Sequence, residues 1–330
     1  MASPRLSLAL ASGEVSLPDG PVVMLNAPSD VELDGLDGER LLIEQDFYPD
    51  FKVLEGRGLK VCSEATGAFG AAIVYLPRAK AAARALIGRA NALTGGGLVL
   101  VDGQKTDGIV AMIKALRGRA ALEGSLSKAH GKLAWFSGGD FADWQDVARR
   151  IEGGFLTRAG VFSADAPDKG SVLLAEALAG QLSGQGADLG AGWGYLGRAA
   201  LAQPAVSRLH LVEASHTALA CARENIDDPR ATFHWADARH WRADQPLDFV
   251  ITNPPFHTGR KGEPELGRAF IRAAAAMLAA KGQLFMVANR HLPYEGELAA
   301  LFRKVEEIAA TPAFKLFHAT NPRRSPVKMR

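Results

Sequence analysis

The sequence predicts an α/β fold built from two tandem Rossmann-like domains, at residues 1–153 and 154–330. The length of 330 residues suits two domains of ordinary size. Strand-like and amphipathic helix-like segments alternate through the second half, as a doubly wound parallel sheet requires. A fainter copy of the same order occupies the first half. With 48% hydrophobic residues, the chain has enough apolar material for a core in each domain.

The second half predicts a seven-stranded, mostly parallel sheet. Five strand-like segments lie at residues 186–189, 208–212, 231–235, 248–252 and 283–287. Helix-like segments lie at 195–203, 217–225, 266–280 and 294–305. Two further strand-like runs, 305–310 and 313–319, are joined only by Thr311 and Pro312. This junction is too short for a parallel crossover, so the last two strands should form an antiparallel hairpin at the sheet edge.

The first half repeats part of this order. A strand-like run at 69–75 precedes a helix-like segment at 78–93, a strand at 98–101 and a helix at 108–116. We infer a duplication in which the first copy kept its fold and lost its chemistry; two unrelated α/β domains are the alternative. The boundary should fall within 153–166, where glycines interrupt a helical pattern at 143–151. Residues 6–11 should begin the first domain, because their apolar run is too short for a signal peptide.

Several classes of protein are excluded by composition. The sequence has no apolar run near the roughly 20 residues that span a bilayer. Cys62 and Cys221 are far apart and belong to no metal-ligand pattern, so we expect neither a disulfide nor a metal site, and a cytoplasmic location. The sequence carries no signal for oligomeric state, and a monomer is the default expectation.

The charges are unevenly distributed although the formal net charge is only +2. Residues 77–132 contain ten basic and three acidic residues, and five basic residues without a carboxylate follow Glu307. Each run on its own is compatible with a solvated helix face. Together they indicate that a polyanion such as RNA binds this protein.

A glycine-rich loop after the strand at 186–189 predicts a cofactor site. Residues 188–197 read DLGAGWGYLG, and glycines allow the sharp turn and close ligand approach that such a loop needs. The pattern fits NAD as well as S-adenosylmethionine. Asp188 favours S-adenosylmethionine, because its carboxylate can face an ammonium group, which a pyrophosphate lacks. Glu213, at the end of the next strand, can accept both ribose hydroxyls of either cofactor. Asp237 can accept from an adenine amino group or can serve only as a turn acid.

The strongest signal is the segment 253–256, NPPF, at the end of a hydrophobic strand. The side-chain oxygen of Asn253 and the carbonyl of Pro254 can accept both N–H bonds of a planar amino group, whose delocalised lone pair makes its methylation difficult. Pro254 and Pro255 stiffen the loop, and Phe256 offers a face for a flat base. A rigid turn without chemistry is the alternative.

With these residues, the sequence resembles class I methyltransferases, and more narrowly the bacterial ribosomal RNA guanine-N2 methyltransferases. The resemblance covers nearly the whole chain and includes the motifs GVFS (160–163), DKGS (168–171), NPPFH (253–257), VAN (287–289), LPY (292–294) and FK (314–315). It implies two tandem methyltransferase domains, of which only the second binds S-adenosylmethionine.

The resemblance also assigns residues. Asp188, Gly190, Gly192, Gly194 and Glu213 would hold the donor, with Asp237 near its adenine and Phe162 and Ser163 close by. Asn253, Pro254, Pro255 and Phe256 would hold the target guanine, and Lys315 would contact a phosphate. Trp193 is unusually bulky for this loop, and we expect it to pack against neighbours rather than cover the donor.

The expected function is therefore methyl transfer to the N2 amine of a guanine in ribosomal RNA, with the RNA of the small subunit as the first expectation. The partner would be the RNA or the ribosomal subunit, with phosphate contacts from the first domain and the C-terminal tail. Three alternatives stay open. The same chemistry could act on an adenine amino group or a protein glutamine amide, the glycine loop could serve an NAD-dependent oxidoreductase, or the protein could bind RNA without catalysis.

Overall fold

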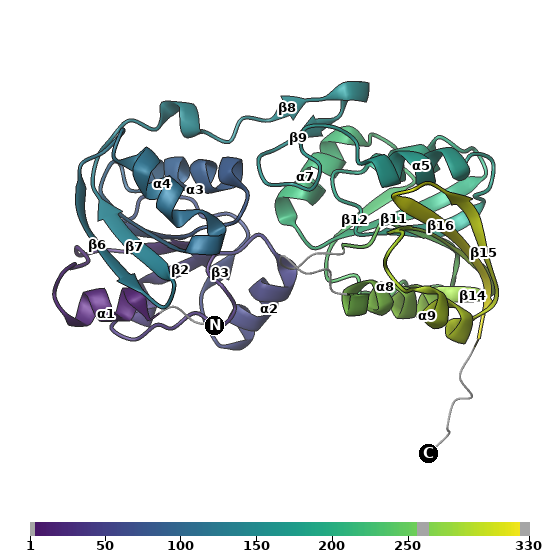
Figure 1. The fold of residues 1–330 in the computed structure, drawn as a ribbon, viewed down its shortest axis with the longest axis horizontal. Coiled ribbons are helices and arrows are strands. Elements are labelled where there is room, and N and C mark those ends of the chain that lie inside the picture. The colour runs from purple at the N-terminus through teal and green to yellow at the C-terminus, as the bar shows by residue number, and fades with distance from the viewer. Residues whose placement is uncertain (1–3, 256–263, 324–330) are drawn as a thin grey trace, which may run out of the picture. The chain divides into compact units, whose positions relative to one another are not determined.

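The computed structural model describes residues 4–255 and 264–323, which form two α/β units. The first unit comprises Met1–Ala148 and Arg158–Gly160, and the second comprises Arg149–Thr157 and Val161–Arg330. Each contains a seven-stranded sheet with helices on both faces (Figure 1). In the described part of the chain, no helix is long and apolar enough to cross a membrane.

The first unit has four α-helices among its described residues, α1 (Arg5–Ala11), α2 (Tyr48–Gly56), α3 (Lys80–Leu93) and α4 (Ile109–Leu116). Its strands are β1 (Val22–Leu25), β2 (Leu41–Glu44), β3 (Val61–Cys62), β4 (Ala71–Tyr75), β5 (Leu98–Gln104), β6 (Leu122–Lys128) and β7 (Gly131–Phe136). The sheet order is β3-β2-β1-β4-β5-β7-β6, and only the β5–β7–β6 end is antiparallel. Leu6 and Leu54 fill the core on one face, and Ile87 and Met112 fill the core on the other.

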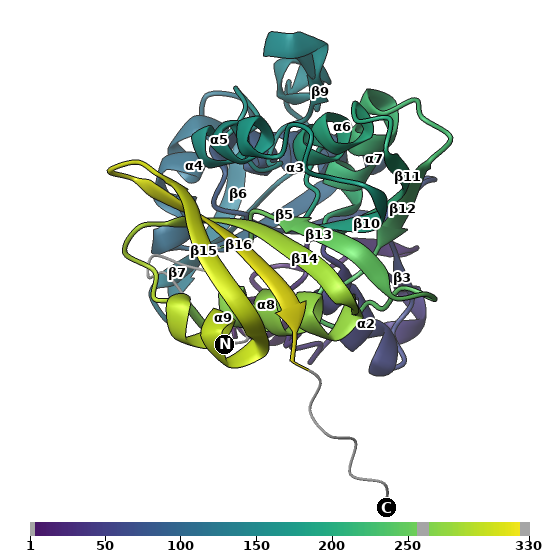
Figure 2. The same cartoon turned by 90° about the vertical axis from the view of Figure 1, so that its right-hand side faces the viewer.

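The second unit repeats this topology. Its strands are β10 (Gly184–Leu189), β11 (Val206–Glu213), β12 (Ala231–Trp235), β13 (Leu247–Thr252), β14 (Leu278–Asn289), β15 (Phe302–Ala310) and β16 (Phe314–Pro322). Its helices are α5 (Lys169–Ala177), α6 (Tyr195–Leu201), α7 (His216–Asn225), α8 (Pro264–Met277) and α9 (Glu295–Leu301). The order β12-β11-β10-β13-β14-β16-β15 matches that of the first sheet strand for strand (Figure 2). The α/β fold with two mostly parallel seven-stranded sheets and an antiparallel C-terminal hairpin is thereby confirmed.

Two predicted helices end earlier than their periodicity suggested. α8 stops at Met277 and α9 at Leu301, and a strand follows each directly. Phe302 already pairs with Pro322 of β16 and is buried, so the sheet ladder takes over where the apolar pattern still fits a helix. Tertiary pairing overrides local propensity at both places.

The helix predicted at 143–151 is wrong. Ala142–Trp144 forms a single 3-10 turn, and Arg149–Arg150 (β8) pairs instead with Leu156–Thr157 (β9). The Trp144 ring is buried in the first core and lies below the guanidinium groups of Arg84 and Arg119, so this segment follows the core rather than a helical axis.

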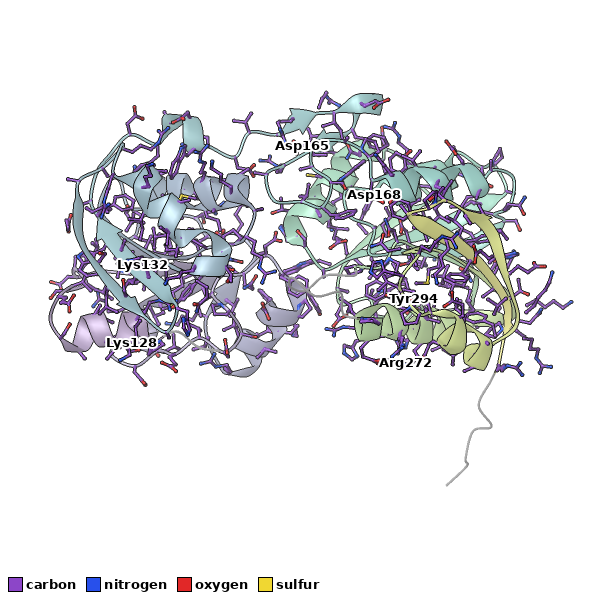
Figure 3. All side chains as sticks on the ribbon, viewed as in Figure 1. Lys128, Lys132, Asp165, Asp168, Arg272 and Tyr294 are labelled. Atoms are coloured by element: carbon purple, nitrogen blue, oxygen red, sulfur yellow. The ribbon has the colours of Figure 1, made fainter. Side chains whose placement is uncertain are left out.

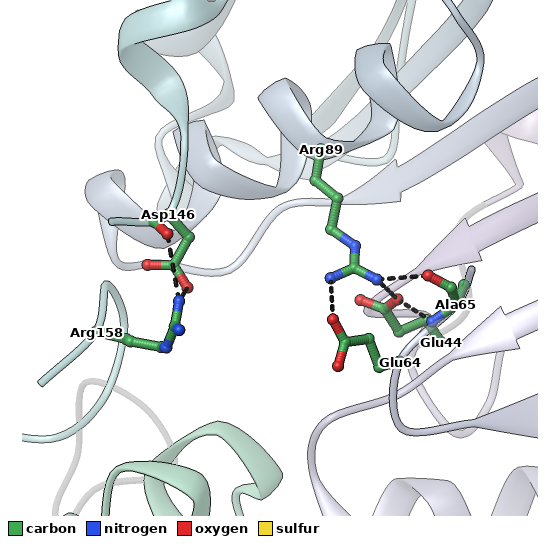
Figure 4. Close-up of polar contacts among 6 residues, drawn as sticks. All are labelled: Glu44, Glu64, Ala65, Arg89, Asp146 and Arg158. Atoms are coloured by element: carbon green, nitrogen blue, oxygen red, sulfur yellow. Dashed lines mark hydrogen bonds and ion pairs between the residues drawn. The ribbon is translucent and has the colours of Figure 1, made fainter. Parts of the chain in front are cut away.

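Two ionic contacts fix segments of the first unit (Figure 4). Asp146 accepts hydrogen bonds from the Arg158 guanidinium at 3.3 Å and from the Ala159 amide at 3.2 Å, which ties residues 158–160 to this unit. Arg89 of α3 donates to the Glu44 carboxylate at the end of β2, at 2.7 Å. This arginine therefore serves the fold rather than a ligand.

Candidate active site

The site is built at the carboxyl edge of the second sheet, where β10, β11 and β13 end side by side. Leu189 of β10 is in register with Val212 of β11 and with Thr252 of β13. The Thr252 hydroxyl donates to the Leu189 carbonyl at 2.7 Å in a buried hydrogen bond. The glycine loop and the loop that begins at Asn253 therefore start from neighbouring, fixed strand ends.

The glycine loop turns in the left-handed region of backbone conformation. Gly190, Gly192 and Gly194 have φ values of +76°, +54° and +90°, which other residues rarely adopt. At Gly194 a Cβ atom would also lie 2.9 Å from the Ile226 side chain. The loop therefore needs glycine for its own geometry and leads directly into α6.

Asp188 has the most unusual environment in the site. Its side chain is fully buried, and among the described residues only the Gly197 backbone amide acts on it as a donor, without a close hydrogen bond. Burial, and then the nearby Glu213 carboxylate, raise the pKa of Asp188 to about 8. A buried carboxyl group with so little hydrogen bonding is costly for the fold. A cationic ligand group beside Asp188 would relieve that cost, so the residue fits an ammonium group.

Two further acids lie at the ends of the neighbouring strands. The Glu213 carboxylate accepts from the backbone amides of Gly192 at 2.8 Å and Ser215 at 2.7 Å, which connects the glycine loop to β11. Asp237 binds the Arg239 guanidinium and accepts from the Arg239 amide. Burial opposes ionisation of Asp237, but the hydrogen bonds to Arg239 prevail and lower its pKa. Asp237 thus has the geometry of a turn acid, and its contact with an adenine stays a prediction.

Trp193 packs, as predicted. Its ring is 4% exposed and meets the Phe155 ring edge-on, with 4.9 Å between centroids. The indole N–H donates to the Phe162 carbonyl at 2.8 Å. This bond ties the segment with Phe162 and Ser163 to the glycine loop. Ser163 has a φ of +50°, and the Phe162 side chain is 55% exposed.

Asn253 is held by Asp168 and Ser171, two residues of the DKGS motif for which no role was predicted. Its side-chain nitrogen donates to Asp168 Oδ2 and to Ser171 Oγ, both at 2.9 Å. Asp168 also begins α5, because the same Oδ2 accepts from the Ser171 amide. With the nitrogen held in this way, the amide oxygen lies on the opposite branch of the planar group, as an acceptor. Pro254 is buried and Pro255 exposed, while Phe256 lies outside the described residues.

Lys315 does not occupy an exposed position suited to a phosphate. Its side chain is 6% exposed, and its ammonium group pairs with Glu295 at the start of α9. Among the described residues, three or more His, Cys, Asp or Glu side chains nowhere gather in a way that could hold a metal ion. The described part of the edge therefore offers acids, loop amides and an oriented asparagine as its chemistry.

Comparison with known proteins identifies the family. The methyltransferase small domain matches residues 152–318. A ribosomal RNA small subunit methyltransferase C from Alteromonas mediterranea is 30% identical over 269 residues, which cover 75% of this chain and 72% of the relative. The chain belongs to this methyltransferase family. A ribosomal RNA large subunit methyltransferase G from Pseudomonas aeruginosa is 40% identical over 171 residues, 50% of this chain and 45% of that protein, so the match spans less than half of its length.

A solved structure supports the fold over both units. The T. thermophilus 16S rRNA N2 methyltransferase, in complex with AdoMet and guanosine, superimposes with a TM-score of 0.74. The two chains are 23% identical, and the match covers 96% of this chain and 91% of the other. The alternative of an NAD-dependent oxidoreductase is therefore wrong, since the chain is a methyltransferase.

The equivalent edge of the first unit of the methyltransferase carries different side chains at the corresponding positions. By strand register, Met24 stands where the second unit has Asp188, and Gln45 stands where it has Glu213. Both residues are buried. Gln45 accepts from the Phe47 amide at 2.8 Å, as Glu213 accepts from the residue two positions ahead, but its nitrogen donates back to the loop carbonyl of Ala27. Both polar atoms of the Gln45 side chain therefore have hydrogen-bond partners within the protein.

The ends of the two central strands are also bridged in the first unit. Asn26 occupies the position of Gly190 and keeps its left-handed backbone, with a φ of +59°. Its side-chain nitrogen donates to the carbonyl of Tyr75, at 2.8 Å, and Tyr75 stands at the position of Asn253. A side chain therefore lies where the second unit has only a glycine.

The raised pKa of Asp188 gives a testable stability effect. An acid whose pKa is raised by folding keeps its proton while the unfolded chain ionises, so stability is lost as the pH rises from 3.8 towards about 8. Asp188→Asn removes this loss. We expect the ligand-free variant to melt at least a few degrees higher than the parent protein at pH 9. Each unit by which folding raises the pKa of Asp188 costs about 1.4 kcal/mol of stability at that pH, and each kcal/mol corresponds to about 2–4 °C for a domain of this size.

The measurement is a pair of calorimetric melting curves at pH 5 and pH 9. The advantage of Asp188→Asn should be small at pH 5 and larger at pH 9. Asp228→Asn, at a partly buried ion pair with Arg230 in the same unit, is the control. An equal difference in melting temperature at both pH values would show that folding does not raise the pKa of Asp188.

Proposed function

We propose that this methyltransferase transfers the methyl group of S-adenosylmethionine to the exocyclic N2 amine of a guanine in ribosomal RNA. The observation that carries the proposal is the oriented amide of Asn253, at the strand end next to the glycine loop and the buried Asp188. The names of the small-subunit and large-subunit relatives support ribosomal RNA as the substrate class. Action on this RNA would place the protein in the cytoplasm.

The residues at the glycine loop suit the donor. Asp188 would ionise against the ammonium group of the methionine part, which supplies the charge partner that the buried acid lacks. Glu213 would accept the ribose hydroxyls, and Asp237 would lie near the adenine. Phe162 and Ser163, tied to the loop through Trp193, would close the methionine end. S-adenosylmethionine supplies an electrophilic methyl group.

The Asn253 loop suits a planar amine. Asn253 Oδ1 and the Pro254 carbonyl would each accept one N–H of the guanine amino group and hold its nitrogen in line with the methyl carbon. As the N–C bond forms and the S–C bond breaks, the nitrogen gains positive charge, which both acceptors stabilise. The extra proton then leaves to water, so no strong base is required. Phe256 would stack on the base, which must be unpaired or flipped out.

The first unit offers a surface for the RNA backbone at the carboxyl edge of its own sheet. Lys105 follows β5, and its amide donates to the carbonyl of His130 in the β6–β7 turn, at 3.0 Å. Lys128 and Lys132 flank that turn (Figure 3), and the side chains of Lys105 and Lys128 are exposed. We name Lys105, Lys128, His130 and Lys132 the basic edge. In the unit that lost its polar site, this edge would bind phosphates.

The role of Asn253 is tested by Asn253→Ala. Loss of one acceptor for the developing charge should lower kcat by about 100-fold or more, with unchanged affinity for S-adenosylhomocysteine. Single-turnover kinetics and calorimetry measure the two quantities. Gln185→Ala is the matched control, because it truncates another half-buried side-chain amide, at the opposite end of β10 from the site. Retained activity in Asn253→Ala would remove this residue from the mechanism.

The substrate class is tested by tritium transfer from labelled donor. We expect label in ribosomal RNA, released on digestion as N2-methylguanosine, because the loop is shaped for a planar exocyclic amine. DNA and a glutamine-containing release factor serve as competing acceptors. Label confined to either of them would contradict the proposal and assign another planar nitrogen as the target.

The basic edge is tested by the double variant Lys105→Glu and Lys128→Glu. Loss of two phosphate contacts should weaken RNA binding by about tenfold or more at moderate salt and reduce the salt dependence by about one unit of slope per lysine. Filter binding across a salt series measures both. The control is Lys52→Glu with Lys60→Glu, which changes the charge equally at exposed lysines outside this edge. Equal losses in both double variants would indicate only a general charge effect.

A further inference from the structure

We propose that Asp168 is the positioning residue that sets the orientation of the Asn253 amide and strengthens its oxygen as an acceptor. Ser171 supports it. The inference rests on the proposed function, because it concerns the same amine-binding loop. It concerns a residue 85 positions earlier in the chain, at the start of α5, and assigns a purpose to the DKGS segment.

The orientation of the amide decides whether Asn253 can act. A terminal amide can turn by half a revolution, which exchanges its oxygen and nitrogen at almost no change in shape. With the oxygen towards the target, Asn253 accepts from the amine; with the nitrogen there, two donors would face one another. Asp168 removes this ambiguity, because an ionised carboxylate only accepts. The wrong orientation would bring two oxygens to the 2.9 Å that now separates Asn253 Nδ2 from Asp168 Oδ2.

The carboxylate is itself fixed by the protein. Its Oδ2 accepts from the Ser171 amide at 2.9 Å, as the cap of α5. Ser171 is buried, and its hydroxyl is the second acceptor for the Asn253 nitrogen. A Cβ atom on Gly170 would lie 3.0 Å from the Phe314 ring, so the first turn of α5 packs closely against β16. Asp168 is therefore held on a packed helix start rather than on a loop.

The negative charge has a second consequence. A hydrogen bond to a carboxylate draws the amide hydrogen and shifts electron density towards the amide oxygen. Asn253 Oδ1 thus becomes a stronger acceptor as the target nitrogen acquires positive charge during transfer. This effect depends on the charge of Asp168 and not on its role as a helix cap.

The cap and the positioning role can be separated by exchange of the two groups. Asn253→Asp alone places two carboxylates side by side and should lose activity by about 100-fold or more. Asn253→Asp combined with Asp168→Asn removes the repulsion between the two carboxylates, because the introduced amide can turn its nitrogen towards the introduced carboxylate and donate to it, at the expense of the bond from the Ser171 amide. We expect the double variant to regain about tenfold or more in kcat over Asn253→Asp. A helix cap alone predicts no such recovery, since the reversed bond takes away the acceptor of the Ser171 amide.

The decisive measurements are kcat from single turnover and the affinity for S-adenosylhomocysteine in the full chain. The donor affinity should stay constant across the series, and Ser171→Ala, which removes only the supporting hydroxyl, should lower kcat less than Asp168→Asn. If Asn253→Asp is inactive and the double variant is no better, the positioning role is overturned while the proposed function stands. Full activity of Asn253→Asp would also overturn the positioning role, since an acceptor oxygen would then act beside Asp168 without the amide nitrogen that Asp168 binds.

One outcome needs a separate measurement. If Asn253→Asp fails to bind S-adenosylhomocysteine, the single variant Asp168→Asn decides, because it keeps the helix cap and the shape of the side chain. A fall in its kcat of about tenfold with unchanged donor affinity supports the positioning role. An unchanged kcat overturns it.

Discussion

The hydrogen bond from Thr252 to the Leu189 carbonyl is the constraint on which the site depends. It joins β10 and β13, the two strands between which the strand order of the sheet reverses, and such a reversal opens a crevice at the carboxyl edge. One strand end leads into the glycine loop and the other into Asn253. The bond is buried and joins the last residues of both strands. It therefore fixes the distance between the start of the glycine loop and the start of the loop that carries Asn253. A shift of either strand by one residue would turn Thr252 away and separate them.

The two units separate what the fold requires from what the chemistry requires. Both have the same strand order, and even the left-handed residue after the first central strand is kept, as Asn26 or Gly190. The first unit places an apolar Met24 where the second has a buried acid without a close hydrogen bond, and its Gln45 bonds within the loop. The polar residues of the second unit are therefore not needed for an α/β sheet of this kind. Their presence in only one of the two units is a physical argument that they serve a ligand.

The sequence was informative where local rules apply. The alternating pattern predicted the strands of the second sheet, and the glycine loop and the NPPF segment marked two strand ends that do lie side by side. Helix ends were misjudged where a sheet ladder took over, as at Phe302, and the helix at 143–151 was wrong because Trp144 belongs to the core. The bond between Asp168 and Asn253 could not be predicted, since spacing along the chain says nothing about which distant side chains meet. The pairing of Lys315 with Glu295 was missed for the same reason.

Asp188 shows why a site of this kind lowers the stability of its own domain. The burial that raises its pKa to about 8 also removes the water that would weaken its attraction for a cation. In the absence of a ligand the acid keeps its proton at neutral pH and contributes nothing favourable. Against an ammonium group the same low-polarity surroundings make the ionised form the stable one, so the strength of the contact and the cost to the empty fold have a single cause. A more exposed acid at this position would stabilise the empty domain and, for the same reason, distinguish less well between a cationic ligand and a neutral one.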